Sequence, residues 1–286
     1  MSRIAYVNGR YLPHQEAGIH IEDRGYQFAD GVYEVCEVRH GHLIEERRHL
    51  DRLDRSLREL RIPAPMSRTA LGLVLKEVVR RNGVINGSVY LQVTRGVARR
   101  EHVFPAPDTP PSLVVTARRA NPATQEATAL HGVAVISVPE NRWPRVDIKS
   151  LSLLPNVLAK QAAKEAGARE AWFVDTNGYV TEGASSNAWI VTHGGAIVTR
   201  PAEAGILRGI TRTVVVEVAD ELGYQLEERP FTLAEAREAA EAFITAASTL
   251  VMPVVTLDGS PIGAGHPGPV ASALRRRFHD FAEVTA

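Results

Sequence analysis

Cysteine is nearly absent from this 286-residue chain, and neither sign of charge is in excess. Cys36 is the only cysteine, so an internal disulfide is impossible and a zinc site built from cysteines is excluded. The ten histidines show no HExxH or similar ligand spacing, and we expect no metal site. The 33 lysines and arginines balance 33 aspartates and glutamates, which gives no reason to expect nucleic acid or an anionic membrane as a partner.

Long hydrophobic runs are also lacking. No apolar stretch approaches the roughly 20 residues that a membrane-spanning helix needs, and residues 1–9 run directly into a strand-turn pattern rather than a secretory segment. Hydrophobic residues make up 44% of the chain, which is ordinary for a globular protein of one large domain or two small ones. We therefore expect a soluble, cytoplasmic protein.

The first half of the chain reads as hairpins and helices. The turn dipeptide Asn8-Gly9 interrupts an apolar run at 4–12 and predicts a β-hairpin. Leucines at positions 50, 53, 57 and 60 mark one face of a helix, which should end before Pro63. Ser67 is a favourable N-cap for a second helix that should end at about residue 82. Further strands are expected at 31–39, 42–45, 88–95 and 112–118.

Residues 119–129 show no periodicity and are typical of an interdomain connection. We therefore predict a small domain at 1–118 and a larger one at 130–286. Strands mixed with helices and joined by tight turns indicate the α+β class, with mixed or antiparallel sheets. The elements expected in the larger domain are strands at 131–138, 171–174, 179–182, 186–192 and 196–199, strands near 224, 242 and 254, and helices at 155–166, 211–222 and 268–283.

Lysine is rare, with four residues against 29 arginines, and one of the four has an unusual setting. Lys76, Lys160 and Lys164 lie on polar faces of predicted helices, whereas Lys149 lies in the apolar, extended-looking run 146–154. Such a lysine can extend its ammonium group to water along an apolar surface. Alternatively, an apolar setting favours the neutral amine, which is the form that makes a Schiff base with a carbonyl. This segment alone leaves both interpretations open.

Two further segments carry potential chemistry. At 180–188, Glu182 ends a predicted strand and is followed by a small, hydroxyl-rich turn, which is either a polar loop or a carboxylate for a protonated ring nitrogen beside a flat cofactor. Residues 206–212 begin a predicted helix, whose free N–H groups and positive dipole end can bind phosphate. An amine, an acidic partner for a ring nitrogen and a phosphate seat are together what pyridoxal phosphate requires of a protein.

With these three segments the chain resembles the fold class IV aminotransferases, and within them the D-amino-acid aminotransferases. The resemblance covers nearly the whole chain and is most specific in EDRGYQFADGVYE at 22–34, QVTRG at 92–96, DIKSL at 147–151 and TEG at 181–183. It implies a smaller N-terminal α/β domain, a larger C-terminal mixed β domain with helices, and a homodimer with active sites near the subunit boundary.

The resemblance also implies a set of cofactor contacts. Lys149 would form the internal aldimine with pyridoxal 5′-phosphate and carry the proton between the substrate Cα and C4′, and Glu182 would keep the pyridine nitrogen protonated. Arg52 looks like the family's phosphate-binding arginine, although its place off the leucine face also permits a solvated helix residue. The other implied contacts are Ile210 and Thr211 at the phosphate, Ser185 near the ring and O3′, and Ala247.

Ala247 marks a departure from the family pattern. The family has a hydroxyl-rich stretch near the phosphate, where this chain reads Thr245-Ala246-Ala247-Ser248, so two hydroxyl donors are missing. Each lost neutral hydrogen bond is worth only about 0.5–1.5 kcal/mol net. We therefore expect weaker phosphate anchoring rather than a lost site.

Substrate recognition should depend on Tyr33, Arg100 and His102. They match the tyrosine, arginine and histidine that hold the substrate α-carboxylate in D-amino-acid aminotransferases, although Arg100 and His102 alone also fit a basic surface loop. The resemblance implies a ping-pong transamination in which D-alanine leaves as pyruvate and 2-oxoglutarate becomes D-glutamate. Alternatives are a branched-chain L-amino-acid aminotransferase, an R-selective amine transaminase, aminodeoxychorismate lyase and a non-catalytic cofactor-binding homologue.

Overall fold

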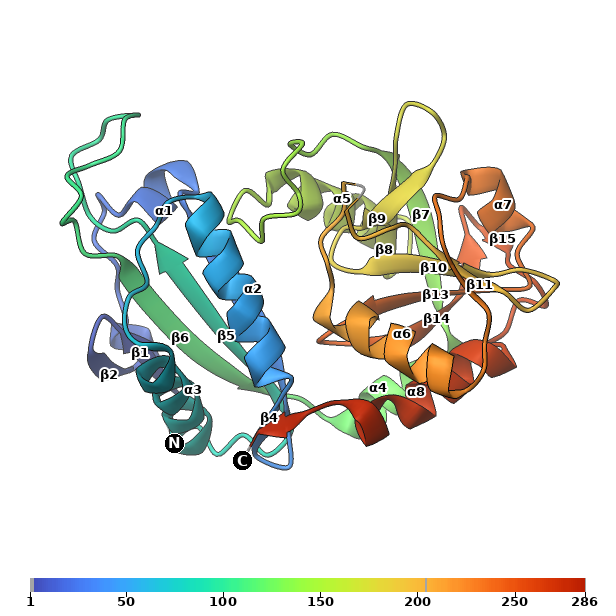
Figure 1. The fold of residues 1–286 in the computed structure, drawn as a ribbon, viewed down its shortest axis with the longest axis horizontal. Coiled ribbons are helices and arrows are strands. Elements are labelled where there is room, and N and C mark those ends of the chain that lie inside the picture. Colours follow the sequence, from blue (N-terminus) through green and yellow to red (C-terminus); the bar gives the residue numbers. More distant parts are fainter. Residues whose placement is uncertain (1–2, 204, 286) are drawn as a thin grey trace. The chain divides into compact units, whose positions relative to one another are not determined.

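The computed structural model describes residues 3–203 and 205–285, which form two compact units (Figure 1). Unit 1 is built from residues up to 122, from 148–152 and from 283 onward, and unit 2 from 123–147 and 153–282. The chain therefore returns to unit 1 twice, first with the short segment that contains Lys149 and then with its last residues.

Unit 1 is an antiparallel sheet in the order β16-β4-β3-β5-β6-β1-β2, with helices α2 and α3 packed on one face (Figure 1). Its core joins the leucine face of α2 to the inward side chains of β3, such as Val32 and Cys36. The strands are β1 (Ile4–Val7), β2 (Arg10–Pro13), β3 (Gly31–Arg39), β4 (His42–Ile44), β5 (Gly87–Thr94), β6 (Ser112–Arg119) and β16 (Val284–Thr285), and the helices are η1 (His14–Glu16), α1 (Arg24–Phe28), α2 (Glu46–Glu59) and α3 (Arg68–Arg81).

Backbone pairing fixes the Lys149 segment at the edge of β3. Along β3, the short strand β4 reaches only Val38 and Arg39, at the far end of that strand. Near the start of β3, Ser150 forms an isolated antiparallel bridge with Val32, and the Tyr33 N–H donates to the Lys149 carbonyl at 3.0 Å. A short apolar segment thus completes the sheet where β4 does not reach, which explains its strand-like sequence.

Unit 2 is a mixed sheet in the order β12-β11-β10-β13-β14-β7-β8-β9, to which β15 adds at β14. Helices α6 and α8 pack against each other and against β13 and β14, and α5 packs against β7 and β8. The strands are β7 (Val133–Pro139), β8 (Glu170–Val174), β9 (Val180–Gly183), β10 (Asn187–Val191), β11 (Ile197–Thr199), β12 (Leu226–Glu228), β13 (Glu241–Ala246), β14 (Leu250–Leu257) and β15 (Ser260–Pro261), and the helices are α4 (Pro122–His131), α5 (Leu154–Glu165), α6 (Ile210–Glu221), α7 (Leu233–Arg237) and α8 (Pro269–Phe281).

The predicted α+β class with antiparallel and mixed sheets is confirmed, and the hairpins and long helices lie where the sequence places them. Most of the predicted connection at 119–129 is helical, because its residues from Pro122 onward belong to helix α4. Only Ala129 of α4 is buried, so the sequence carries no apolar periodicity there. Polar contacts hold the helix instead, with Gln125 donating to the Ser248 carbonyl and Glu126 pairing with Arg275 at 2.7 Å. Among the described residues, no helix is long and apolar enough to cross a membrane.

Replacing Leu75 by alanine should destabilise unit 1, because this side chain is fully buried between α3 and the sheet. Removing a buried leucine costs about 2–5 kcal/mol, through lost burial and the cavity that remains. Leu73 lies on the same helix and is 65% exposed, so Leu73→Ala is a matched control with a change of about 0.5 kcal/mol or less. Urea unfolding followed by circular dichroism measures both variants, and equal losses would contradict the described packing.

Candidate active site

Two of the predicted site residues, Lys149 and Tyr33, lie together in unit 1. The Lys149 Nζ is 4.2 Å from the centroid of the Tyr33 ring, a distance at which an ammonium is attracted to the ring face. The Lys149 backbone is held as well, since its N–H donates to Ser56 Oγ at 3.4 Å and its carbonyl accepts from Tyr33. The amine is therefore placed by a fixed segment, and its side chain is half-buried.

Arg52 is committed to a buried carboxylate on the neighbouring strand. Its Nε and Nη2 donate to the two oxygens of Glu34 at 2.7 and 2.8 Å, and His49 Nδ1 lies 2.7 Å from Glu34 Oε2. Glu34 faces the core beside Val32 and is completely buried, so its charge needs these partners. Arg52 is thus not a solvated helix residue, and the pair with Glu34 uses two of its five N–H donors.

The charge state of this cluster follows from burial and pairing. Burial alone would raise the pKa of the Glu34 carboxyl, but the Arg52 guanidinium and the His49 hydrogen bond outweigh it and hold that pKa well below its usual range. Burial lowers the pKa of His49, against the opposing effect of Glu34. Near neutral pH, Glu34 is therefore ionised and His49 is neutral, with its Nδ1–H donating because a carboxylate can only accept.

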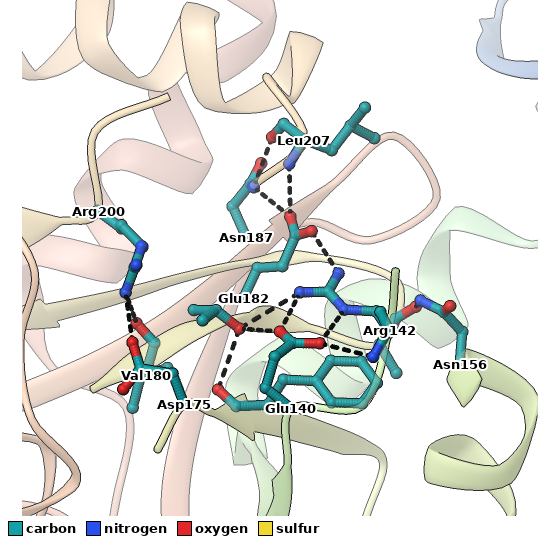
Figure 2. Close-up of polar contacts among 12 residues, drawn as sticks. Glu140, Arg142, Asn156, Asp175, Val180, Glu182, Asn187, Arg200 and Leu207 are labelled. Atoms are coloured by element: carbon teal, nitrogen blue, oxygen red, sulfur yellow. Dashed lines mark hydrogen bonds and ion pairs between the residues drawn. The ribbon is translucent and has the colours of Figure 1, made fainter. Parts of the chain in front are cut away.

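Glu182 is a buried acidic residue of unit 2 that accepts hydrogen bonds from three donors (Figure 2). It lies near the end of β9 and is 5% exposed. Its Oε1 accepts from Arg142 Nη1 at 2.5 Å, and its Oε2 accepts from Asn187 Nδ2 at 3.0 Å and from the Leu207 N–H at 3.1 Å. The sequence predicted the carboxylate, whereas its partners Arg142 and Asn187 were not predicted.

The turn after Glu182 is tied to a second buried carboxylate. Ser185 and Ser186 both donate through Oγ to Glu170 Oε2, at 2.7 and 3.1 Å. A Cβ on Gly183 would lie 2.2 Å from Ser186 Oγ, so a larger residue there would displace the Ser186 hydroxyl. The predicted site residue Ser185 is therefore oriented by Glu170, which the sequence did not single out.

The start of α6 brings together Ile210 and Thr211, both of which are buried. Gly209 precedes them, and a Cβ there would lie 2.1 Å from Asn187 Oδ1. Within the described part of the chain, no side chain caps this helix, so its first N–H groups and positive dipole end are available in the way that an anion site requires. Asn187 also donates to the Leu207 carbonyl at 2.9 Å and so joins the Glu182 carboxylate to the loop that leads into α6.

Ala247 lies half-buried in the turn between β13 and β14. The turn is closed by the Thr249 N–H, which donates to the Ala246 carbonyl at 3.1 Å. Thr245 keeps a hydroxyl near this turn, but its Oγ1 accepts from Trp189 Nε1 at 2.9 Å inside the core. The alanines therefore leave the stretch with fewer side-chain donors, as the sequence indicated.

Arg100 and His102 form a separate group in unit 1, on the loop between β5 and β6. Both lie against Phe28, with the Arg100 Cζ 5.0 Å and the His102 ring centroid 5.6 Å from the Phe28 ring centroid. The loop backbone is anchored where Arg24 donates to the Glu101 carbonyl at 2.6 Å. The structure therefore groups Arg100 with His102 on Phe28, and groups Tyr33 with Lys149.

Comparison with known proteins identifies the family. The model of the family described as Amino-transferase class IV matches residues 31–257, and the chain belongs to this family of enzymes. Among its relatives, the D-alanine aminotransferase of Bacillus licheniformis is 43% identical over 268 residues, which cover 94% of this chain and 93% of that protein. The D-alanine aminotransferase of Staphylococcus haemolyticus is 37% identical over 97% of each chain.

Solved structures confirm the expected fold class IV architecture. The T.th. branched-chain amino acid aminotransferase, solved with pyridoxamine 5′-phosphate, superposes with a TM-score of 0.90 at 29% identity, covering 98% of this chain and 94% of that one. A hypothetical aminotransferase from Mycobacterium tuberculosis, in a PLP-bound form, gives a TM-score of 0.82 at 25% identity, covering 96% and 97%.

The buried His49 should make the stability of unit 1 depend on pH. Its folded-state pKa is lowered by burial, so below the unfolded value of about 6.5 the unfolded chain binds more protons, and stability is lost as the pH falls through that value. His49→Gln should flatten the pH dependence of the unfolding free energy between about pH 7.5 and 5.5. Urea unfolding at several pH values measures the slope, with His42→Gln as the control because His42 is exposed. Equal slopes in wild type and His49→Gln would contradict the neutral, buried state of His49.

Proposed function

We propose that this chain is a pyridoxal-phosphate-dependent transaminase that moves the amino group between D-amino acids, such as D-alanine and D-glutamate, and 2-oxo acids, such as pyruvate and 2-oxoglutarate. The observation that carries the cofactor assignment is the buried Glu182 carboxylate, which three donors hold in place. Similarity to D-alanine aminotransferases over 94% of the chain supports the choice of substrate.

The described residues fit pyridoxal phosphate at each of its polar groups. Glu182 offers a fixed anionic acceptor, as a protonated ring nitrogen requires, and when bound the cofactor supplies an electron sink for the carbanion at the substrate Cα. The small residues Ala184 and Ser185 that follow would let a flat ring approach the backbone, with Ser185 assigned to O3′. The N–H groups at Ile210 and the Thr211 hydroxyl would hold the phosphate.

The resemblance to the family also assigns roles to Lys149 and Arg52, which lie in unit 1. The Lys149 amine would attach the cofactor and then, from Nζ, move the proton between the substrate Cα and C4′. Arg52 would give the phosphate a charge-assisted donor while Glu34 holds its guanidinium in a fixed plane. With alanines at 246 and 247, the helix start would carry a larger share of the phosphate binding, and the hydroxyl donors that are missing would weaken it modestly.

Substrate orientation is assigned to Tyr33, Arg100 and His102. A phenol, a guanidinium and an imidazole all donate hydrogen bonds to a carboxylate, and holding that carboxylate on one side decides which Cα hydrogen faces Lys149. We further propose a cytoplasmic homodimer, as the resemblance to the family implies. A branched-chain enzyme shares the fold at 29% identity, below the 43% shared with a D-alanine aminotransferase, so the D-substrate is favoured.

Replacing Lys149 by alanine should abolish the visible absorbance band of lysine-bound cofactor and all transamination, because the attaching amine is gone. Lys164→Ala is the matched control, since it removes an exposed lysine on α5. Both proteins are incubated with pyridoxal phosphate, desalted and examined by absorption spectroscopy. A band that persists in Lys149→Ala would place the attachment elsewhere, and a wild-type protein without any band would refute the cofactor assignment.

D-Alanine should bleach the cofactor band of the wild-type enzyme, while L-leucine and R-phenylethylamine should leave it unchanged. Arg100→Ala should raise the KM for D-alanine by roughly 10- to 150-fold, because a hydrogen bond to a charged group is worth about 1.5–3 kcal/mol. Arg99→Ala removes the exposed neighbouring arginine and serves as control. Steady-state kinetics with 2-oxoglutarate gives the KM values. Reaction with L-leucine alone, or equal effects of the two substitutions, would overturn the assignment of Arg100.

A further inference from the structure

We propose that Arg142 is a positioning residue that keeps the shared proton of the Glu182–cofactor pair on the ring nitrogen rather than on Glu182. This inference rests on the proposed function, in which Glu182 faces that nitrogen. Arg142 lies in the loop after β7, 40 positions before Glu182 in the sequence, and Figure 2 shows its guanidinium between the carboxylates of Glu140 and Glu182.

Arg142 is held so that it cannot turn away from Glu182. Its Nε and Nη2 donate to Glu140 at 2.9 and 2.6 Å, and its backbone N–H donates to Glu140 Oε1 at 3.0 Å. The remaining nitrogen, Nη1, lies 2.5 Å from Glu182 Oε1, and the Cζ stacks 4.4 Å from the centroid of the Phe173 ring. The side chain is 6% exposed, so this charge is buried and its direction is set.

The cluster gathers two carboxylates around one guanidinium. Glu140 and Glu182 contribute two carboxylates against the single guanidinium of Arg142. The Thr181 hydroxyl donates to Glu140 Oε2 at 2.7 Å, and Asn187 and Leu207 give Glu182 neutral donors. The neighbouring Asp175 and Arg200 form an ion pair at 3.4 Å, so their opposite charges offset each other. Two buried carboxylates that share one guanidinium favour a nearby cation, and a protonated ring nitrogen is one.

Burial and pairing also shift the pKa values of the groups in this cluster. Burial alone would raise the pKa of Glu140, but the hydrogen bonds from Arg142 outweigh it and lower that pKa. Burial alone would lower the pKa of Arg142, but its bonds to Glu140 and the charge of Glu182 raise it. Glu140 is therefore ionised, and Arg142 keeps its positive charge, across the range in which such an enzyme works.

The position of the Arg142 charge decides where the shared proton resides. Coulomb energy falls with distance, and Arg142 touches Glu182, whereas a ring nitrogen that bonds to Glu182 must lie farther from the guanidinium. The positive charge therefore stabilises the ionised carboxylate more than it disfavours the protonated ring. Without Arg142, two carboxylates would face each other in a buried site, and like charges favour protonation of one of them. A protonated Glu182 would donate to the ring nitrogen instead of accepting from it.

The test compares Arg142→Met and Arg142→Gln, which remove the charge, with Arg142→Lys, which keeps it. Pyridoxal phosphate labelled with ¹⁵N in the ring is bound to each protein, and the ¹⁵N chemical shift reports the protonation of the ring nitrogen directly. We expect a protonated ring in the wild type and in Arg142→Lys, and a shift toward the neutral ring in both neutral variants. In those variants the kcat of the D-alanine half-reaction should fall by roughly 10- to 150-fold, the range for one lost hydrogen bond to a charged group, with KM little changed.

Arg145→Met is the matched control, because Arg145 lies in the same loop, is half exposed and pairs with Asp147. It should keep the wild-type ¹⁵N shift. A protonated ring in either neutral variant would overturn the proposal and leave Arg142 a merely structural role. Neutral variants that bind no cofactor, while Arg142→Lys does, would also overturn it, since Arg142 would then serve binding. A wild type that binds no pyridoxal phosphate, or ignores D-alanine, would instead contradict the proposed function itself.

Discussion

Buried carboxylates that require a positive partner determine how both units are built. Glu34 in unit 1 and Glu182 in unit 2 each lie on a strand, and each is almost fully removed from water. An isolated buried charge is strongly unfavourable, so each strand position demands a matching cation from another part of the chain. Arg52 and Arg142 supply those cations and thereby fix the helix and the loop that carry them.

The need for cations beside buried carboxylates explains why arginine outnumbers lysine in this chain. The planar guanidinium can bind a carboxylate at two points and contact further carbonyls, whereas an ammonium is a compact and strongly hydrated charge. Arg275 illustrates the difference, because it pairs with Glu126 and also donates to the carbonyls of Thr249 and Val251. None of the four lysines is fully buried, and Lys149 is the one whose amine lies over a tyrosine ring. The chain thus uses arginine for fixed charge and leaves lysine for the position where an amine is wanted.

Local signals made much of the fold predictable. Asn8 and Gly9 adopt φ angles of 43° and 92°, as the turn dipeptide indicated, and Ser67 caps α3 through its hydroxyl. Elements that depend on contacts between residues distant in the sequence could not be predicted from local patterns. Helix α4 has no apolar face because its partners are polar, and the five-residue helices α1 and α7 are too short to show a period.

The candidate site was likewise predictable only where its residues are unusual in their local sequence. Lys149 and Glu182 stand out in the sequence because a lysine in an apolar run and a carboxylate before a glycine turn are locally unusual. Arg142 could not be found this way, since a Glu-x-Arg loop looks solvated until the fold brings Glu182 to it. Gly183 shows a second limit of prediction from sequence. Small residues at the Glu182 turn were expected for the approach of a cofactor, but the space beside the Gly183 Cα is taken by the Ser186 hydroxyl of the same turn.

The return of the chain to unit 1 has a consequence for the order of events during synthesis. Strand β16 pairs with β4, and the Glu283 N–H donates to Glu45 Oε1 at 2.7 Å. The sheet of unit 1 therefore lacks its outer strand until residues 283–285 have left the ribosome, although residues 3–119 supply its other six strands much earlier. Until then the outer edge of β4 stays unpaired, which is the state in which sheets join wrong partners. β4 is only three residues long, and so short an edge limits that hazard during translation.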